Sequence, residues 1–404
     1  MISVEEALAR VTGNVSLLGS ETVPVGEAHG RVLAEEVVSR VTQPPADVSS
    51  MDGYAVRAAD LGDPPTKLKR VGESAAGGGF TGQVGAGEAA RIFTGAPVPA
   101  GADAVVMQED TEAAGDEVTF NVTVTPGNFI RPKGLDFAEG AVLLPAGRVL
   151  TARDVGLAAA MNVPWLQVRR RPRVAILATG NEVVMPGDPV GPAQIISSNS
   201  VALAAYVRAL GGEPVNLGIA GDTVDQLRAK MAASAGADVL VTIGGASVGD
   251  YDLVGQVLGD EGLDLTFYKV AMRPGKPLIF GQLGRTAVLG LPGNPVSAGV
   301  TSMIFLRAAM AVMLGTEDGA LGSRGALLGR DLKENDRRQD YLRATLAHDA
   351  EGNLVATPFD KQDSSMLALF AQADCLVIRP PHAPAAKTGG RVEIIPFQTG
   401  GLSI

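Results

Sequence analysis

Val239-Leu-Val-Thr-Ile-Gly-Gly-Ala-Ser-Val-Gly-Asp-Tyr-Asp252 joins an apolar run to a glycine-rich turn that carries hydroxyl groups and two carboxylates. The same arrangement, an apolar run ending in a Gly-rich or Pro-rich turn, recurs at residues 174–182 and 288–297. Such runs, separated by helical patterns, are typical of parallel strands buried on both faces. Because the ligand crevice of an open parallel sheet lies outside the carboxyl ends of its strands, the three turns predict a site for a phosphorylated ligand and a metal.

The composition is that of a multidomain globular protein. With 404 residues, 46% hydrophobic and 19% charged, the chain can bury a sizeable core in roughly two to four domains. The formal net charge of −10 argues against a nucleic-acid surface, which needs a basic footprint. An anionic small substrate stays compatible with this charge, because local cations or a metal can reverse the field within one cleft.

The cysteine and histidine content excludes some kinds of site. Cys375 is the only cysteine, so no intramolecular disulfide can form, and its apolar neighbours Leu376-Val-Ile378 predict a buried thiol on a strand. The three histidines lie far apart in the sequence, which disfavours a zinc site made of His and Cys.

The sequence shows neither a signal peptide nor an uninterrupted membrane-spanning segment. The N-terminus, Met1-Ile-Ser-Val-Glu-Glu, has neither the basic nor the apolar segment of a signal peptide. The longest apolar stretch, residues 296–314, is interrupted by Arg307 and small polar residues, which favours a buried helix over a membrane span. We therefore expect a cytoplasmic protein that contacts neither membrane nor nucleic acid.

In the first half of the chain the sequence pattern changes from helical to strand-like and then back to helical. Ser3-Val-Glu-Glu6 is a capping box that opens a helix to about residue 15. Short strand-like runs cut by Gly and Pro follow in residues 43–140 and predict a small β-rich module. Thr151 then caps a predicted helix over residues 152–161.

The second half alternates strands and helices and then returns to strands. Alternation over residues 171–322 predicts a doubly wound α/β domain, with helices over 201–210, 224–235 and 295–314. Asp222 or Thr223 caps the second of these helices, and Asn294 the third. After Gly325 the pattern is again β-like, with a hairpin around residues 349–353 in a small barrel or sandwich.

The turn after residue 243 has the richest chemistry. Its glycines let backbone N–H groups approach a phosphate, Ser247 adds a donor, and Asp250 and Asp252 offer hard oxygen ligands for Mg²⁺. The phosphate-binding candidates are Gly244, Gly245, Ser247 and Gly249. The alternative is an ordinary strand-to-helix loop in which Asp252 only caps the next helix. The turn is neither a Walker A loop nor a Gly-x-Gly-x-x-Gly fingerprint.

Two further turns are suited to anions. Arg273 and Lys276 stand three residues apart on a Pro/Gly turn, an arrangement that suits an oxyanion; the alternative is a solvated turn. Residues 292–297 place the start of a helix at the end of a strand, which favours anion binding. The candidates there are Pro292, Gly293, Asn294 and Ser297, and the alternative is a well-capped helix without a ligand.

Three single residues complete the candidates. Glu182, in Thr179-Gly-Asn-Glu182, is a candidate base, metal ligand or acceptor for a nucleotide hydroxyl; the alternative is a surface turn. Asp52 lies on a sharp turn in Ser50-Met-Asp-Gly-Tyr-Ala55, and Thr94 on another in residues 91–103. Taken singly, the last two motifs are more often structural than functional.

Together and in this order, the motifs resemble those of the molybdopterin molybdotransferase family of the MoeA type, also found as the E domain of gephyrin. The resemblance covers about residues 1–400 and is carried by six motifs: those at 51–55, 93–103, 179–182, 244–250, 274–277 and 291–297. The chain departs from the usual pattern at Asn181, Leu135 and Ala246. Asn181 and Leu135 each replace a carboxylate, which leaves Asp136 without its usual acidic neighbour.

The resemblance implies an elongated homodimer of four-domain subunits. It implies a discontinuous N-terminal dimerisation domain (1–42 and 141–170), a β-rich domain (43–140), an α/β domain that binds the molybdopterin nucleotide (171–322) and a C-terminal β-barrel-like domain (323–404). The active cleft of the family lies between the third domain of one subunit and the second of the other. Transient contacts with the molybdopterin adenylyltransferase and with molybdoenzyme-maturation proteins are also implied.

The implied reaction takes adenylylated molybdopterin and molybdate, cleaves the phosphoanhydride with a divalent metal such as Mg²⁺, and releases AMP and molybdenum cofactor. On this basis Asp52, Thr94 and Glu182 are the catalytic candidates. Asp222, Asp250 and Asp252 are the metal candidates. Molybdate is expected near Arg273, Lys276 and Ser297, with Arg343 and Ser365 of the last domain as further candidates.

Three alternatives compete with this interpretation. A scaffold would keep the fold without turnover, as in the receptor-clustering gephyrin branch. Another enzyme of phosphorylated metabolites would use the same strand-end turns but would not respond to molybdate. A Rossmann dehydrogenase is disfavoured because its glycine fingerprint is missing.

Overall fold

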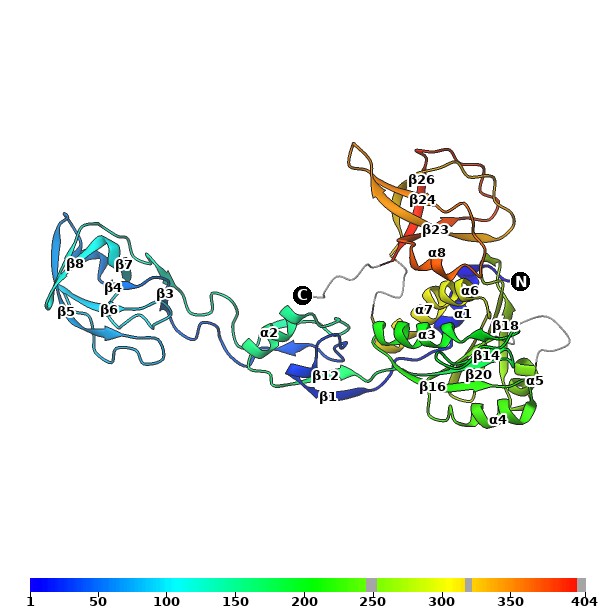
Figure 1. The fold of residues 1–404 in the computed structure, drawn as a ribbon. Coiled ribbons are helices and arrows are strands. Elements are labelled where there is room, and N and C mark those ends of the chain that lie inside the picture. Colours follow the sequence, from blue (N-terminus) through cyan, green and yellow to red (C-terminus); the bar gives the residue numbers. More distant parts are fainter. Residues whose placement is uncertain (245–252, 317–321, 398–404) are drawn as a thin grey trace.

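The computed structural model describes residues 1–244, 253–316 and 322–397 and arranges them as an elongated molecule (Figure 1). A β-rich module lies at one end, joined by two chain segments to a small middle region. An α/β region with a β-barrel beside it forms the other end. The elongated shape keeps the first and second halves of the sequence largely in separate bodies.

The α/β region is built on a six-stranded sheet in the order β16-β13-β17-β21-β20-β18. The first four strands are parallel, and the last two are antiparallel to their neighbours. The three apolar runs identified in the sequence are the neighbouring parallel strands β13, β17 and β21. The bounds are β13 Arg173–Thr179, β16 Glu213–Ala220, β17 Val239–Ile243, β18 Asp264–Lys269, β20 Pro277–Leu283 and β21 Thr286–Leu291.

Helices cover both faces of this sheet, which confirms the doubly wound arrangement. Val174 and Ile176 of β13 pack into the core shared with α1, α3, α6 and α7. Ala175 and Leu177 point to the other face and pack with α4 and α5. The bounds are α1 Val4–Gly13, α3 Ser198–Ala209, α4 Val224–Ala232, α5 Leu253–Asp260, α6 Pro295–Thr301 and α7 Arg307–Leu314.

The helix starts refine the predictions from sequence. Thr223, not Asp222, caps α4, because its side chain accepts a hydrogen bond from the Gln226 N–H. α3 begins at Ser198, three residues before the predicted start at Val201. Asn294 precedes α6 as predicted, but its side chain makes no capping bond to that helix.

The apolar stretch that ends near Leu314 is a core helix, as predicted. A π-helical turn, Ser302–Leu306, lies between α6 and α7, and the helix ends at Gly315 in the left-handed conformation (φ 69°). Among the described residues, Pro295–Leu314 is the one helix long and apolar enough to cross a membrane. Because 78% of its 18-residue apolar window is buried inside the protein, this helix is part of the core.

The β-rich module is a six-stranded sheet in the order β7-β4-β6-β5-β9-β8. Tyr54 and Phe120 meet edge to face in its core, with ring centres 5.8 Å apart. Its strands are β4 Gly53–Val56, β5 Thr66–Ser74, β6 Glu88–Ile92, β7 Ala104–Met107, β8 Thr111–Ala114 and β9 Glu117–Phe120. The pair β3 Val48–Ser49 with β10 Ile130–Arg131 leads from this module toward the middle region.

The middle region combines segments from both sides of the module. It holds α2 Ala152–Ala160, which begins with a capping box made by Thr151 and Asp154. Two antiparallel pairs complete it: β1 Ser20–Pro24 with β12 Trp165–Arg169, and β2 Val37–Val38 with β11 Val142–Leu144.

The last strands close into a barrel, because β23 pairs with both β24 and β25 in the ring β23-β24-β22-β26-β25. Cys375 lies buried on β25, as predicted, and burial raises the pKa of its thiol to about 12. The bounds are β22 Arg324–Leu328, β23 Gln339–His348, β24 Leu354–Pro358, α8 Leu367–Ala371, β25 Cys375–Arg379 and β26 Arg391–Pro396. Strand β19, Met272–Arg273, extends this sheet from the α/β region.

Candidate functional site

The carboxyl ends of β13, β17 and β21 form one continuous edge. β13 is flanked by β16 on one side and β17 on the other, so the chain reverses its direction of winding between β13 and β17. Ligands of open α/β sheets bind at such a switch point. The Thr179 hydroxyl donates to the Ile243 carbonyl (3.2 Å) and the Gly244 N–H to the Leu291 carbonyl (3.1 Å), which ties the three strand ends together.

Asn181 and Asp222 link the turns that follow β13 and β16. Farther along the chain, β14 Val183–Val184 and β15 Ile195–Ile196 pair as a small parallel sheet. The Asn181 N–H donates to the Asp222 carboxylate, and the Asp222 N–H donates to the Asn181 side-chain oxygen, each at 3.1 Å. An aspartate at position 181 could make the same pair of bonds. The departure from the usual family residue therefore keeps the geometry and removes one negative charge from the edge.

Glu182 is exposed at the same edge. Its carboxylate lies so close to Gly180 that a Cβ there would meet Glu182 Oε2 at 2.4 Å, and Gly180 has a φ of 130°. Glycine is thus favoured at position 180 by its conformation, whereas the exposed Glu182 side chain could move away from a Cβ there.

The turn after β17 is only partly within the described residues. Gly244 has a φ of 91°, and a Cβ there would lie 3.0 Å from Thr179 oxygens, so the strand ends need glycine at this point. The other candidates of this turn lie outside the described residues: Gly245, Ser247, Gly249, Asp250 and Asp252. Within the described part of the chain, no group of three or more His, Cys, Asp or Glu side chains could hold a metal.

The turn after β21 contacts both α3 and the barrel. The Asn199 side-chain amide donates to the Gly293 carbonyl at 2.7 Å. The Asn294 side chain donates to the Ser364 hydroxyl (2.8 Å), and the Val296 N–H donates to the Ser364 carbonyl (3.0 Å). The first turn of α6, which starts after Pro292-Gly-Asn294 and contains the buried Ser297, is thus partly capped by the barrel.

The Arg273 guanidinium is occupied by groups of the barrel. It donates to Asp336 and to Asn335, each at 3.3 Å, and to Asp340. Asp340 is buried, and burial raises the pKa of its carboxyl even though Arg273 opposes this change. Lys276 stands exposed on the same turn.

Arg343 lies on β23 of the barrel, and Ser365 lies in the loop between β24 and α8. Arg343 is only 1% exposed, and desolvation lowers the pKa of its guanidinium. It donates to the Gln362 side chain and the Met366 carbonyl, each at 3.3 Å, so it holds the loop that carries Ser364 and Ser365. The Ser365 hydroxyl donates to Asp363 at 2.5 Å.

Asp52 and Thr94 form a second cluster, on the β-rich module. Although 42 residues separate them, the Thr94 N–H and hydroxyl both donate to Asp52 Oδ1 at 2.7 Å. These hydrogen bonds, helped by the nearby Arg91, lower the pKa of the Asp52 carboxyl. The single hydroxyl proton of Thr94 is thus given to Asp52.

The two clusters lie at opposite ends of one chain (Figure 1). The structure therefore brings Asp222 and Glu182 to one edge with the glycine turns, and Asp52 to Thr94, but it does not bring the two groups together. Within one chain, the candidate residues therefore form two separate clusters.

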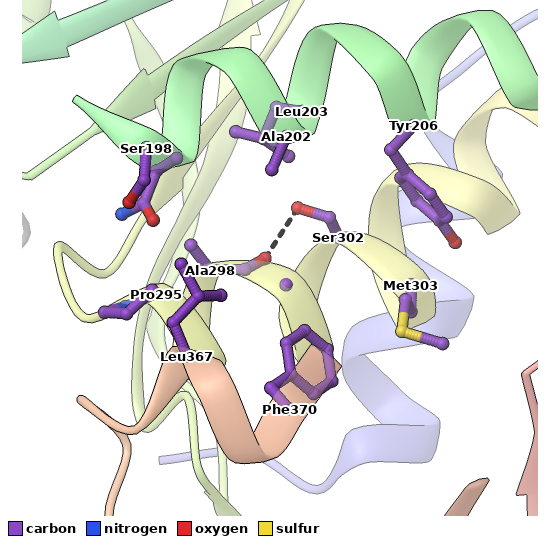
Figure 2. A pocket seen from close by; sticks show the side chains of 12 residues that line it. Ser198, Ala202, Leu203, Tyr206, Pro295, Ala298, Ser302, Met303, Leu367 and Phe370 are labelled. Carbon is purple, nitrogen blue, oxygen red and sulfur yellow. Dashed lines mark hydrogen bonds between the residues drawn. The ribbon is translucent and has the colours of Figure 1, made fainter. Parts of the chain in front are cut away.

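Two hollows near these clusters were not identified in the sequence. A cavity of 660 Å³ beside Thr94 is lined by Gly95, Pro97, Arg131, Leu135 and Asp136, among others. An apolar cavity of 160 Å³ lies between α3, α6 and α8, with Tyr206, Met303 and Phe370 around it (Figure 2). Each is assembled from segments distant in the sequence, so no local motif could have indicated it.

Comparison with known proteins covers nearly the whole chain. Three family models match: the MoeA N-terminal region (domain I and II) over residues 2–162, a probable molybdopterin binding domain over 175–311, and the MoeA C-terminal region (domain IV) over 326–397. A molybdopterin molybdenumtransferase 2 of Mycobacterium tuberculosis is 36% identical over 98% of this chain and 99% of its own. A molybdopterin molybdenumtransferase of Nostoc sp. is 42% identical over 93% and 88%.

Similarity extends to solved structures. The crystal structure of a molybdopterin biosynthesis MoeA protein from Pyrococcus horikosii superimposes with a TM-score of 0.86 at 33% identity. The superposition covers 99% of this chain and 100% of that one.

Proposed function

The chain belongs to the molybdopterin molybdenumtransferase family, the MoeA type, and on that premise we propose that it inserts molybdate into adenylylated molybdopterin. In this reaction the phosphoanhydride is cleaved, AMP leaves, and molybdenum cofactor is formed. The observation that most supports the proposal is the meeting of the carboxyl ends of β13, β17 and β21 at one switch point beside Asp222 and Glu182. Backbone N–H groups at such an edge suit phosphate oxygens.

The metal assignment remains part of the proposal. Asp222, Asp250 and Asp252 would hold a divalent cation, because carboxylate oxygens are the donors that Mg²⁺ prefers. Such a cation would neutralise charge on the phosphoanhydride. The exposed carboxylate of Asp222, already oriented by Asn181, suits this donor set. Glycines 244, 245 and 249 with Ser247 would bind the phosphate and pterin side.

Molybdate is a tetrahedral dianion and needs cations and hydroxyl groups. Arg273 and Lys276 would supply the charge, with Ser297, Arg343 and Ser365 nearby. For Arg273 to bind the anion, its guanidinium would have to exchange part of its contact with Asp336 and Asp340 for molybdate oxygens. Anion binding would then be linked to the contact between this turn and the barrel.

A homodimer would complete the site. In one chain Asp52 and Thr94 lie far from the strand-end edge, and a second copy would bring its own β-rich module to that edge. The middle region exposes Val38, Val142, Val149 and Trp165, the last with 58% of its surface exposed, which suits an interface between copies. The proposal keeps the four-domain division at 1–42 with 141–170, 43–140, 171–322 and 323–404.

The cellular setting follows the same proposal. The protein would work in the cytoplasm, with transient contacts to the molybdopterin adenylyltransferase that supplies its substrate and to maturation proteins that receive its product.

The test is to incubate the protein with adenylylated molybdopterin and Mg²⁺ and to measure the release of AMP with and without molybdate. We expect release that depends on molybdate. Tight binding without release would favour a binding or scaffold role. Absence of binding would favour an enzyme of other phosphorylated metabolites, and either result would overturn the proposal.

A further inference from the structure

Arg91 stands on the β-rich module directly behind the turn that carries Asp52. It is the register partner of Tyr54, so the two side chains share one face of the β4–β6 pair. The guanidinium carbon lies 5.3 Å from the centre of the Tyr54 ring and 4.8 Å from that of Phe93. Two aromatic rings therefore fix the place of this cation.

The guanidinium holds the main chain of the Asp52 turn. Its Nη1 donates to the Gly53 carbonyl at 3.2 Å, and its Nη2 donates to Gln108 Oε1 at 2.6 Å. The Gln108 N–H in turn donates to the Asp52 carbonyl at 3.1 Å. Arg91 thus holds the Gly53 carbonyl directly. It also binds the side chain of Gln108, the residue whose main-chain N–H binds the Asp52 carbonyl.

The carboxylate of Asp52 is held from the other side by Thr94, through two bonds of 2.7 Å. Asp52 itself is exposed, so packing against a core does not fix it. The bond from Arg91 to the Gly53 carbonyl holds the main chain of the turn, and the N–H and hydroxyl of Thr94 hold the carboxylate itself.

We infer that Arg91 is a positioning residue for the transfer reaction: it acts through Asp52, by holding the main chain of its turn, and does not touch the substrate. This inference rests on the proposed catalytic role of Asp52. Its stacking partners Tyr54 and Phe93 and its acceptor Gly53 belong to the turn or to the strands beside it, and its second acceptor, Gln108, follows β7.

The test is kinetic and uses the full chain. Arg91→Met keeps the length and apolar stem but removes both donors. We expect kcat for molybdate-dependent AMP release to fall about tenfold or more, because small misplacements of a catalytic group are costly. KM for adenylylated molybdopterin should change by less than about twofold, since an exposed turn contributes little to overall binding. Arg91→Lys should recover part of kcat.

A double mutant decides whether Arg91 acts through Asp52. If it does, Asp52→Ala combined with Arg91→Met is as slow as Asp52→Ala alone. Multiplied losses, or wild-type kcat in Arg91→Met, would overturn the inference. Wild-type turnover by Asp52→Ala would instead overturn the role proposed for Asp52, so the two failures are distinguishable.

Two further variants guard against a general loss of structure. Arg70→Met removes another arginine of the same sheet, which makes an exposed pair with Asp116 at 3.6 Å, and it should leave kcat unchanged. Gln108→Met, at an exposed position, removes the side-chain acceptor of Arg91 and keeps the main-chain bond from residue 108 to the Asp52 carbonyl. It should lower kcat by a few fold with an unchanged melting temperature. An unchanged kcat in Gln108→Met would remove the contact between Arg91 and Gln108 from the inference.

Discussion

The strand-end edge and the Asp52 turn hold their carboxylates by different means. At the edge, parallel strands tied through backbone bonds such as Gly244 N–H to Leu291 carbonyl set the positions, and Asp222 and Glu182 follow the turns. On the β-rich module, side chains act together with the backbone: the N–H and the hydroxyl of Thr94 bind the Asp52 carboxylate, and the Arg91 guanidinium binds the turn behind it. The edge should therefore tolerate changes of side chain that the Asp52 turn does not.

Removal of Asp52 is the strongest test of this contrast. Asp52→Ala should lower molybdate-dependent AMP release by about 10²–10⁴-fold, the usual contribution of a catalytic carboxylate. The fold should stay intact because the side chain is exposed, and a thermal melt checks this. Turnover at the wild-type rate would show that the proposed role is wrong.

Lys276 tests the anion turn at the other end of the molecule. Lys276→Ala should raise the molybdate concentration needed for half-maximal release about tenfold or more, because a charge-assisted contact to the dianion is lost. Binding of adenylylated molybdopterin, measured by calorimetry, should change much less. Equal loss of both would contradict a role specific to molybdate.

Thr94 tests how much a single side-chain bond contributes on the β-rich module. Thr94→Val removes a donor to the ionised form of Asp52, so the pKa of that carboxyl should rise toward its ordinary value. The acid limb of the pH–rate profile should then move to higher pH. The shift should be partial, since the larger backbone bond from residue 94 stays. If the acid limb did not move, ionisation of Asp52 would not be the cause of that limb.

Asn181 tests charge at the edge without a change of geometry. Asn181→Asp adds a carboxylate beside Asp222 and should strengthen Mg²⁺ binding severalfold, because ligand charge tunes affinity in oxygen-ligand sites. Calorimetric titration with Mg²⁺ in the absence of substrate measures this. Asn181→Ser is the matched control, and weaker binding in Asn181→Asp than in the control would place the metal elsewhere.

Thr223 tests the tolerance expected of the edge. Thr223→Ala removes the cap of α4 and should cost about 1 kcal/mol in the free energy of unfolding. Because backbone bonds set the strand ends, kcat should stay near the wild-type value. Urea denaturation and the AMP assay on the same sample check both, and a large loss of kcat would show that the edge depends on α4.

The sequence was most informative where local patterns decide structure. Apolar runs predicted β13, β17 and β21, and turn residues predicted the hairpin after β23 and the capped start of α2. Local patterns do not reveal bonds between distant segments. The Asp52–Thr94 pair, the contacts of Arg273 with the barrel and the bond from Asn294 to Ser364 each depend on tertiary packing. Asn294 illustrates the limit, because its position was predicted and its partner was not.

The β-rich module leaves the middle region on two chain segments that run side by side. Ser39 bonds to residues 140 and 141, and Gln43 bonds to Phe137, so the outgoing and returning segments are hydrogen-bonded at their root. The β-rich module is therefore connected by two hydrogen-bonded segments, and such a connection resists twisting better than a single linker would. The position of Asp52 relative to the α/β region is accordingly set by the direction of these two segments, and a change at residues 39–43 would move a carboxylate that lies far from the change.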